Sequence, residues 1–132
     1  QKYLSGFVSV KNAAGTIVGQ FDANGKLASS GATSGFTGLA FSATPVFDGS
    51  VANTFKITLT GNVTSSTLVN VAAGQPLNFI VCQDATGSRT MSWPSNVRGA
   101  MTIGSTAGKC SAQTFVYDGV NAFATSPGVS NQ

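Results

Sequence analysis

The chain of 132 residues has no histidine and no glutamate, and these two absences exclude several kinds of chemistry. Without histidine, neither the Ser–His–Asp nor the Cys–His arrangement of nucleophilic enzymes can form. The only acidic side chains belong to four aspartates, each one to three residues before a glycine, as turn-forming aspartates are. A glycosidase with two catalytic aspartates is therefore disfavoured. We predict that the protein is not an enzyme and has no catalytic residues.

Charge is scarce as well. Charged residues make up 8% of the chain, whereas about 25% is usual in a soluble domain. The seven lysines and arginines are scattered and form no basic stripe, so we expect no binding of nucleic acid. No run of about 18 apolar residues occurs, which predicts that no segment spans a membrane. The chain begins with glutamine and does not start with a signal peptide, in which basic residues precede an apolar stretch. This fits a mature secreted protein, although a chain cut elsewhere would look the same.

Cysteine is limited to Cys82 and Cys110. Scarce charge together with abundant serine and threonine favours a disulfide between them in an oxidising compartment. In the chain-entropy model such a bridge stabilises the fold by about 3–4 kcal/mol. The rival interpretation is a metal site, but two thiolates without histidine cannot complete a zinc shell within one chain. We therefore expect no metal and no other cofactor, and an extracellular location, secreted or on a virion surface.

What the sequence does contain is alternation of apolar and polar residues, which is typical of β-strands. Hydrophobic residues make up 42% of the chain and include nine phenylalanines, enough to form a core. In residues 54–60, Phe55, Ile57 and Leu59 share one face, and polar side chains occupy the other. Residues 75–83 are largely apolar on both faces, which predicts a central strand. The Asp-Gly pair at 118–119 predicts a hairpin turn.

These patterns predict an all-β fold in two parts. From residue 36 to 132 we expect about seven to nine short strands in an antiparallel β-sandwich of jelly-roll type. Residues 1–35 hold short apolar stretches broken by turns and end in the flexible composition SSGATSG. We predict that they form an extended N-terminal β arm, a short hairpin with a linker, that needs a partner surface on its own domain or on a neighbouring copy. On a neighbouring copy, the subunit interface would consist of the apolar side chains of Tyr3, Leu4, Phe7, Val8 and Val10.

The stretch FIVCQDATGSRTMSWPSN, residues 79–96, permits two interpretations. In the first, Asp84, Arg89 and Trp93, together with Tyr117, form a ligand-binding site with an aromatic platform, as sugar-binding loops do. In the second, the stretch is architecture, and Asp84 accepts backbone hydrogen bonds in a turn and pairs with Arg89. Trp93 then caps one end of the core, with its indole N–H on a carbonyl oxygen. We favour the second interpretation.

Two parts of the sequence resemble known proteins. Residues 22–35, DANGKLASSGATSG, resemble short segments of phage tail fibres and other trimeric-shaft proteins. Residues 83–124 resemble a β-rich terminal module of phage-tail-fibre-like and secreted bacterial surface proteins, in which a D-x-x-G…W-P hairpin precedes an F-x-Y-D-G hairpin. The corresponding positions are Asp84, Gly87, Trp93, Pro94, Phe115, Tyr117, Asp118 and Gly119. The resemblance implies an extracellular fibre or surface module and no chemistry.

Two functions fit these observations. In the first, which we favour, the protein is a self-assembling structural subunit of an extracellular filament or fibre, and its N-terminal arm completes a β-sheet of a neighbouring subunit. A head-to-tail contact of this kind that does not close generates a filament. In the second, the protein is a carbohydrate- or receptor-binding module of a fibre tip, with surface glycans as partners. A buried Trp93 would favour the first function, and an exposed Trp93 the second.

Overall fold

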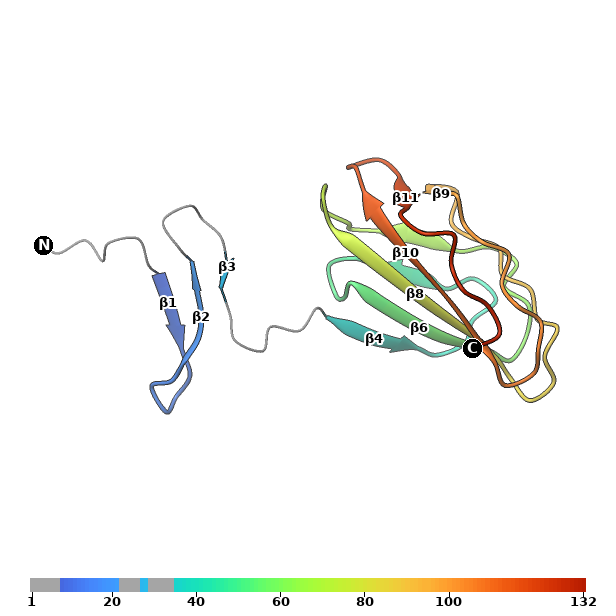
Figure 1. Cartoon of the computed structure of the whole chain (residues 1–132), viewed down its shortest axis with the longest axis horizontal. Coiled ribbons are helices and arrows are strands. Elements are labelled where there is room, and N and C mark those ends of the chain that lie inside the picture. The colour runs from blue at the N-terminus through green and yellow to red at the C-terminus, as the bar shows by residue number, and fades with distance from the viewer. Residues whose placement is uncertain (1–7, 22–26, 29–34) are drawn as a thin grey trace, which may run out of the picture. The chain divides into compact units, whose positions relative to one another are not determined.

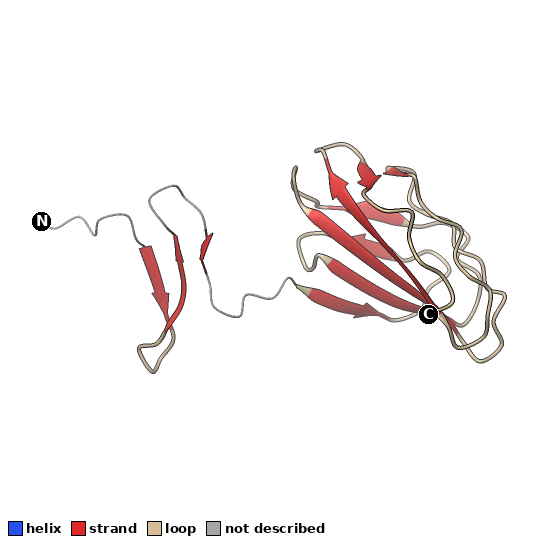
Figure 2. Ribbon diagram, in the orientation of Figure 1, coloured by secondary structure: helices blue, strands red, loops and turns tan. Residues whose placement is uncertain are grey.

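The computed structural model describes residues 8–21, 27–28 and 35–132, which form strands and loops and contain no helix (Figure 2). The predicted all-β character is therefore confirmed. By its internal contacts the chain divides into two compact units, Gln1–Thr33 and Ser34–Gln132.

The N-terminal unit contains a three-stranded antiparallel sheet in the order β1-β2-β3. Its strands are β1 (Val8–Lys11), β2 (Ile17–Phe21) and β3 (Leu27–Ala28). The turn between β1 and β2 is held by Asn12, whose Oδ1 accepts the N–H groups of Ala14 and Thr16 at 3.0 Å each. Residues 10–16 are all exposed, so this turn is stabilised by its own hydrogen bonds and not by burial.

Part of the predicted subunit interface falls in this sheet. Val8 and Val10 lie on β1, and the side chain of Val10 is exposed. Tyr3, Leu4 and Phe7 lie outside the described residues.

The second unit contains two sheets. The larger one has six strands in the order β4-β6-β8-β10-β11-β9, and β5 and β7 pair separately. Figure 1 shows β4, β6, β8 and β10 side by side. The bounds of these strands are β4 (Phe36–Leu39), β5 (Val46–Asp48), β6 (Thr54–Leu59), β7 (Thr67–Val69), β8 (Pro76–Gln83), β9 (Val97–Arg98), β10 (Cys110–Tyr117) and β11 (Ala122–Ala124).

The strand directions are mixed. β4, β6 and β8 are parallel neighbours, and so are β5 and β7. The chain passes from the large sheet to the small one and back, and thereby resembles a β-solenoid of about 3 turns. β10 ends this winding, since it runs antiparallel to both β8 and β11, and β9 pairs with β11 in parallel.

The prediction of an antiparallel jelly-roll sandwich is therefore wrong. An apolar side chain at every second position shows which face of a strand is buried, but it does not show the direction of the neighbouring strand. Each parallel pair here needs a connection that leaves the sheet and returns, and residues 40–53 and 60–75 supply it through β5 and β7.

In the core, similar apolar residues of successive turns stack on one another. Leu39, Ile57 and Val81 occupy one in-register row across β4, β6 and β8. The predicted alternation of β6 is confirmed, since its three apolar side chains point inward and are buried. In parallel strands the register repeats residue by residue, so each turn extends the same apolar row.

Phe79 on β8 is the centre of an aromatic cluster. Its ring centroid lies 5.0 Å from that of Phe47 and 5.5 Å from those of Phe55 and Phe115. The contacts with Phe47 and Phe115 are edge-to-face, a favourable arrangement for aromatic rings. All four rings are buried, so this cluster joins both sheets of the unit in one core.

β8 lies between β6 and β10, which confirms that residues 75–83 contain a central strand. Cys82 and Cys110 face each other directly in the register of β8 and β10 and form the predicted disulfide. This bridge fixes the start of β10 at the end of β8, and the chain between them forms the loop region in which the candidate site lies.

Candidate functional site

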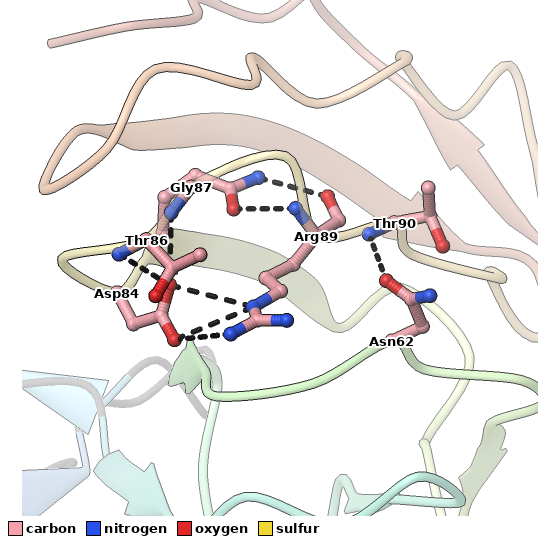
Figure 3. A network of polar contacts seen from close by, with 7 residues as sticks. Asn62, Asp84, Thr86, Gly87, Arg89 and Thr90 are labelled. Carbon is pink, nitrogen blue, oxygen red and sulfur yellow. Dashed lines mark hydrogen bonds and ion pairs between the residues drawn. The ribbon is translucent and has the colours of Figure 1, made fainter.

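The loop after β8 is organised by Asp84. Its Oδ1 accepts the backbone N–H groups of Thr86 at 3.0 Å and Gly87 at 2.9 Å, as the predicted turn requires. Gly87 has a φ of 73°, which favours glycine. Arg89 donates from Nη2 to Oδ2 at 3.0 Å (Figure 3). The hydrogen bond from Arg89, and then those from Gly87 and Thr86, hold the pKa of Asp84 below its ordinary value of 3.8.

Arg89 uses only part of its guanidinium group in this ion pair. Nε and Nη2 both donate to Asp84, whereas Nη1 makes no hydrogen bond within the described residues. The Arg89 side chain is 28% exposed. The side chain of Gln83 fixes the backbone of Arg89. Oε1 of Gln83 accepts the N–H of Arg89, and Nε2 of Gln83 donates to the carbonyl oxygen of Arg89, both at 2.9 Å. Arg89 is thus held in place while part of its donor capacity stays available.

Residues 99–105 form a second loop segment, opposite residues 84–89. Side chains from β8 and β10 hold it in place. Gln83 and Ser111 are both buried and both reach Gly104. Gln83 Nε2 donates to the carbonyl oxygen of Gly104 at 2.8 Å, and Ser111 Oγ accepts its N–H at 2.8 Å. Both backbone groups of Gly104 are therefore satisfied without a neighbouring strand.

Gln113, also buried, holds the other end of this loop. Its Oε1 accepts the N–H of Met101 at 2.7 Å, and its Nε2 donates to the carbonyl oxygens of Gly99 at 3.0 Å and Ser126 at 2.8 Å. The described residues contain three buried polar side chains, Gln83, Ser111 and Gln113. All three form hydrogen bonds with the backbone of residues 99–105.

Trp93 packs on the core and connects residues 88–93 with the loop of residues 99–105. Its ring packs edge-to-face on Phe79, with centroids 5.4 Å apart, and at 6.0 Å from Phe115. The indole N–H donates to the carbonyl oxygen of Met101 at 2.9 Å. Trp93 therefore packs against the core and its indole N–H reaches a carbonyl oxygen, as predicted. The side chain is partly buried and still lines a pocket.

That pocket lies between the two segments and has a volume of about 420 Å³. Its lining combines an arginine, apolar side chains and hydroxyl groups, and contains no acidic residue. Its members are Ser88, Arg89, Thr90, Met91, Trp93, Ala100, Met101, Thr102, Ile103 and Ser105.

The structure brings together only some of the residues predicted for a ligand site. Asp84 and Arg89 form an ion pair, and Arg89 and Trp93 line one pocket. Tyr117 ends β10, eight residues long, at the end away from Cys110, and packs partly buried against the core. It does not line the pocket of Arg89 and Trp93.

Sequence reasoning missed Gln83, Ser111 and Gln113. A signal for them was present, because each occupies an inward-facing position of an alternating strand. Gln83 continues the inward series of β8, and Ser111 and Gln113 begin that of β10. A polar residue at an inward position must be satisfied by a buried partner, but the sequence does not indicate which part of the chain supplies it.

A second feature is the outer edge of the first solenoid turn. β4 ends the six-stranded sheet, and within the described residues no strand pairs with its other edge. Its sequence FTGL contains neither the charge nor the proline that commonly protect edges. Phe36 is 60% exposed, and Val46 and Val51 of the same turn are more than half exposed.

Neither a cluster of metal ligands nor a membrane-spanning helix is found in the part of the chain that the structure describes. No group of three or more histidine, cysteine, aspartate or glutamate residues there is placed to hold a metal ion. No helix there is long and apolar enough to cross a membrane.

Comparison with known proteins identifies a family that this chain matches. The model of a family described as "Putative phage tail fibre C-terminal domain" matches residues 43–122, more than half of the chain. This range contains the disulfide, the Asp84–Arg89 pair and the pocket. No curated protein and no solved structure matches the chain.

Proposed function

The chain belongs to the family of phage tail fibre C-terminal domains, and from that premise we propose that copies of it join head to tail within a fibre. Family membership gives the protein a fibre-associated structural or receptor-binding role as a component of the virion surface. In the proposed assembly, the N-terminal unit of one subunit adds a strand to the open edge of β4 in its neighbour.

The observation that carries this proposal is the unprotected edge of β4. An edge strand presents unpaired N–H and C=O groups, which attract a further strand unless charge, proline or a covering segment prevents it. β4 contains neither a charged residue nor a proline. The exposed ring of Phe36 would gain burial beneath an added strand.

The N-terminal unit is suited to provide that strand. Within the described residues its sheet has three short strands and two open edges, at β1 and β3. All of its residues 10–16 are exposed, and Val10 presents an apolar side chain without burial. A small sheet of this kind is marginal alone and gains stability by pairing.

The test compares the full chain with the variant Phe36→Lys by negative-stain electron microscopy and light scattering at neutral pH without reductant. We expect filaments or higher oligomers from the natural chain. The variant should raise the concentration needed for assembly at least about tenfold, because a buried aromatic contact is lost and a charge is introduced. The matched control is Phe123→Lys, which makes the same change at a half-exposed phenylalanine on β11.

Deletion of residues 1–33 supplies the complementary test. The remaining unit keeps its own aromatic core and its disulfide, so it should fold and stay monomeric. Filaments that persist in both Phe36→Lys and the deletion variant would refute strand addition at this edge. A monodisperse full chain would refute self-assembly itself.

The pocket lined by Arg89 and Trp93 favours receptor binding as a second candidate function. Binding sites for small ligands are concave and mostly apolar, with a few polar groups that fix the ligand's orientation. The pocket has this composition, and its volume of about 420 Å³ lies in the usual range.

A further inference from the structure

We propose that the pocket between residues 88–93 and 100–105 binds a sugar unit that carries a carboxylate or a phosphate. This inference goes beyond fibre assembly and does not depend on it, and it gives the receptor-binding candidate a ligand class. It rests on four properties of the pocket, namely its preformed walls, its apolar side chains, its single cationic group and its hydroxyl groups.

The two walls are joined at both ends, so the pocket exists before a ligand arrives. At one end, Gln83 donates to the carbonyl oxygens of Arg89 at 2.9 Å and Gly104 at 2.8 Å. At the other end, the indole of Trp93 donates to Met101 at 2.9 Å. A site that is already ordered loses little conformational entropy on binding, which raises its affinity for small ligands.

The apolar part of the lining suits the C–H face of a sugar ring. Met91 and Trp93 contribute from one wall, and Met101 and Ile103 from the other. The face of an aromatic ring carries partial negative charge, so it attracts the weakly positive C–H groups of a pyranose. Thioether side chains adapt their shape to an irregular ligand. These four side chains would bury one side of the ring.

Arg89 determines the charge of the ligand. A guanidinium group has five N–H donors, and two parallel ones bind a carboxylate or phosphate in a fork. Only Nε and Nη2 of Arg89 donate to Asp84. The Asp84 carboxylate also accepts two backbone N–H groups of its loop, so its charge is shared among several donors. Asp84 thus positions the guanidinium, and the two Nη1 donors, which make no hydrogen bond within the described residues, remain for a ligand.

Hydroxyl groups complete the site. Ser88 and Thr90 contribute from one wall, and Thr102 and Ser105 from the other. Each hydroxyl both donates and accepts, which matches the hydroxyl groups of a sugar. A simple anion would use Arg89 alone, whereas a sugar also offers its hydroxyl groups to these four exposed side chains.

The experiment follows amide resonances of the isotope-labelled full chain that carries Phe36→Lys, a change outside the pocket that suppresses assembly, without reductant, during titration with glucuronate, glucose-6-phosphate and glucose. Concentrations up to about 10 mM detect dissociation constants in the millimolar range. We expect the two anionic sugars to shift the amides of residues 88–93 and 100–105 and the indole resonance of Trp93, the chain's single tryptophan. Glucose should bind at least about tenfold more weakly, because it forms no charged fork with Arg89.

Matched variants separate binding from structure. Arg89→Gln should weaken both anionic sugars at least about tenfold, whereas Arg98→Gln, the same change at an exposed site on β9 outside the pocket, should leave them unaffected. Thr102→Trp should block all binding by filling the pocket from an exposed position. Thr106→Trp, exposed and outside the lining, is its control. The blocking variant keeps the test decisive if Arg89→Gln fails to fold.

Binding of only one of the two anionic sugars supports the proposal and identifies the anion. The proposal is overturned if no sugar binds, if glucose binds as tightly as the anionic sugars, or if the shifts lie outside the two walls. Retention of affinity in folded Arg89→Gln also overturns it. Light scattering on the natural chain reports assembly separately, so a failure of strand addition at β4 is distinguished from a failure of sugar binding.

Discussion

The two halves of the second unit hold the polypeptide in different ways. In residues 35–83, each solenoid turn bonds to the next through backbone ladders, and phenylalanines fill the interior. Residues 84–109 contain only the two-residue strand β9. There, Gln83, Ser111 and Gln113 supply hydrogen bonds that a neighbouring strand would otherwise supply.

This difference shows where the molecule has freedom to form a site. A ladder fixes the position of every residue along it, so the register of the strands determines the shape of the regular half. A loop held by side chains can diverge from its neighbour and enclose space between them, while buried polar groups still specify one arrangement. The pocket lies in the irregular half for this reason, and hydrogen bonds from side chains hold its loop walls in place.

The largest effect should come from the regular half. Phe79→Ala removes the ring that contacts Phe47, Phe55, Trp93 and Phe115. We expect a loss of about 3–5 kcal/mol in the free energy of unfolding, as for other buried aromatic truncations. Denaturant titration measures it. A loss below about 1 kcal/mol would show that the aromatic cluster is not the centre of the core.

Removal of the disulfide should rank second. Replacing Cys82 and Cys110 together by alanine frees a loop of sequence separation 28. We expect a loss of about 2–4 kcal/mol. The bridge closes the irregular half, so amide hydrogen exchange should accelerate more in residues 99–105 than in β6. Equal acceleration in both regions would contradict the proposed difference between the halves.

A smaller effect is expected when a buried amide of the irregular half is replaced. Gln113→Met leaves the N–H of Met101 and the carbonyl oxygen of Ser126 without their partner. An unsatisfied buried group costs about 1–3 kcal/mol, and exchange of the Met101 amide should accelerate. The control is Gln75→Met in the regular half, where the half-exposed site lets water replace the lost bonds. A larger loss in the control would reverse the comparison.

The smallest effect should be the response to acid. Hydrogen bonds lower the pKa of Asp48, mainly from the Ser50 hydroxyl, and of Asp84, mainly from Arg89, below the ordinary 3.8. Carboxylates with a lowered pKa stabilise the folded state above pH 3.8, and this contribution is lost as the pH falls below that value. Denaturant midpoints measured across this range should fall in acid. Asp84→Asn should reduce the slope, and an unchanged slope would contradict the role of Asp84.

The sequence predicted local features of both halves well. The inward face of β6, the Asp84 turn and the carbonyl contact of the Trp93 indole all follow from neighbouring residues or from the bulk and polarity of one side chain. The pocket could not be predicted in the same way. Gln83 and Gln113 find their partners up to 21 residues away along the chain, and no local pattern shows which backbone group they reach.

The sequence by itself determined which residues face the interior, where the chain turns, and which two cysteines form a disulfide, because these depend on the alternation, the turn residues and the number of cysteines. The tertiary structure decided the parallel solenoid winding. Parallel and antiparallel strands share the same period of two, so only the partner strands and their connections distinguish them. It also decided the pocket, since Arg89 and Ile103 come to line one space only after β8 and β10 have paired.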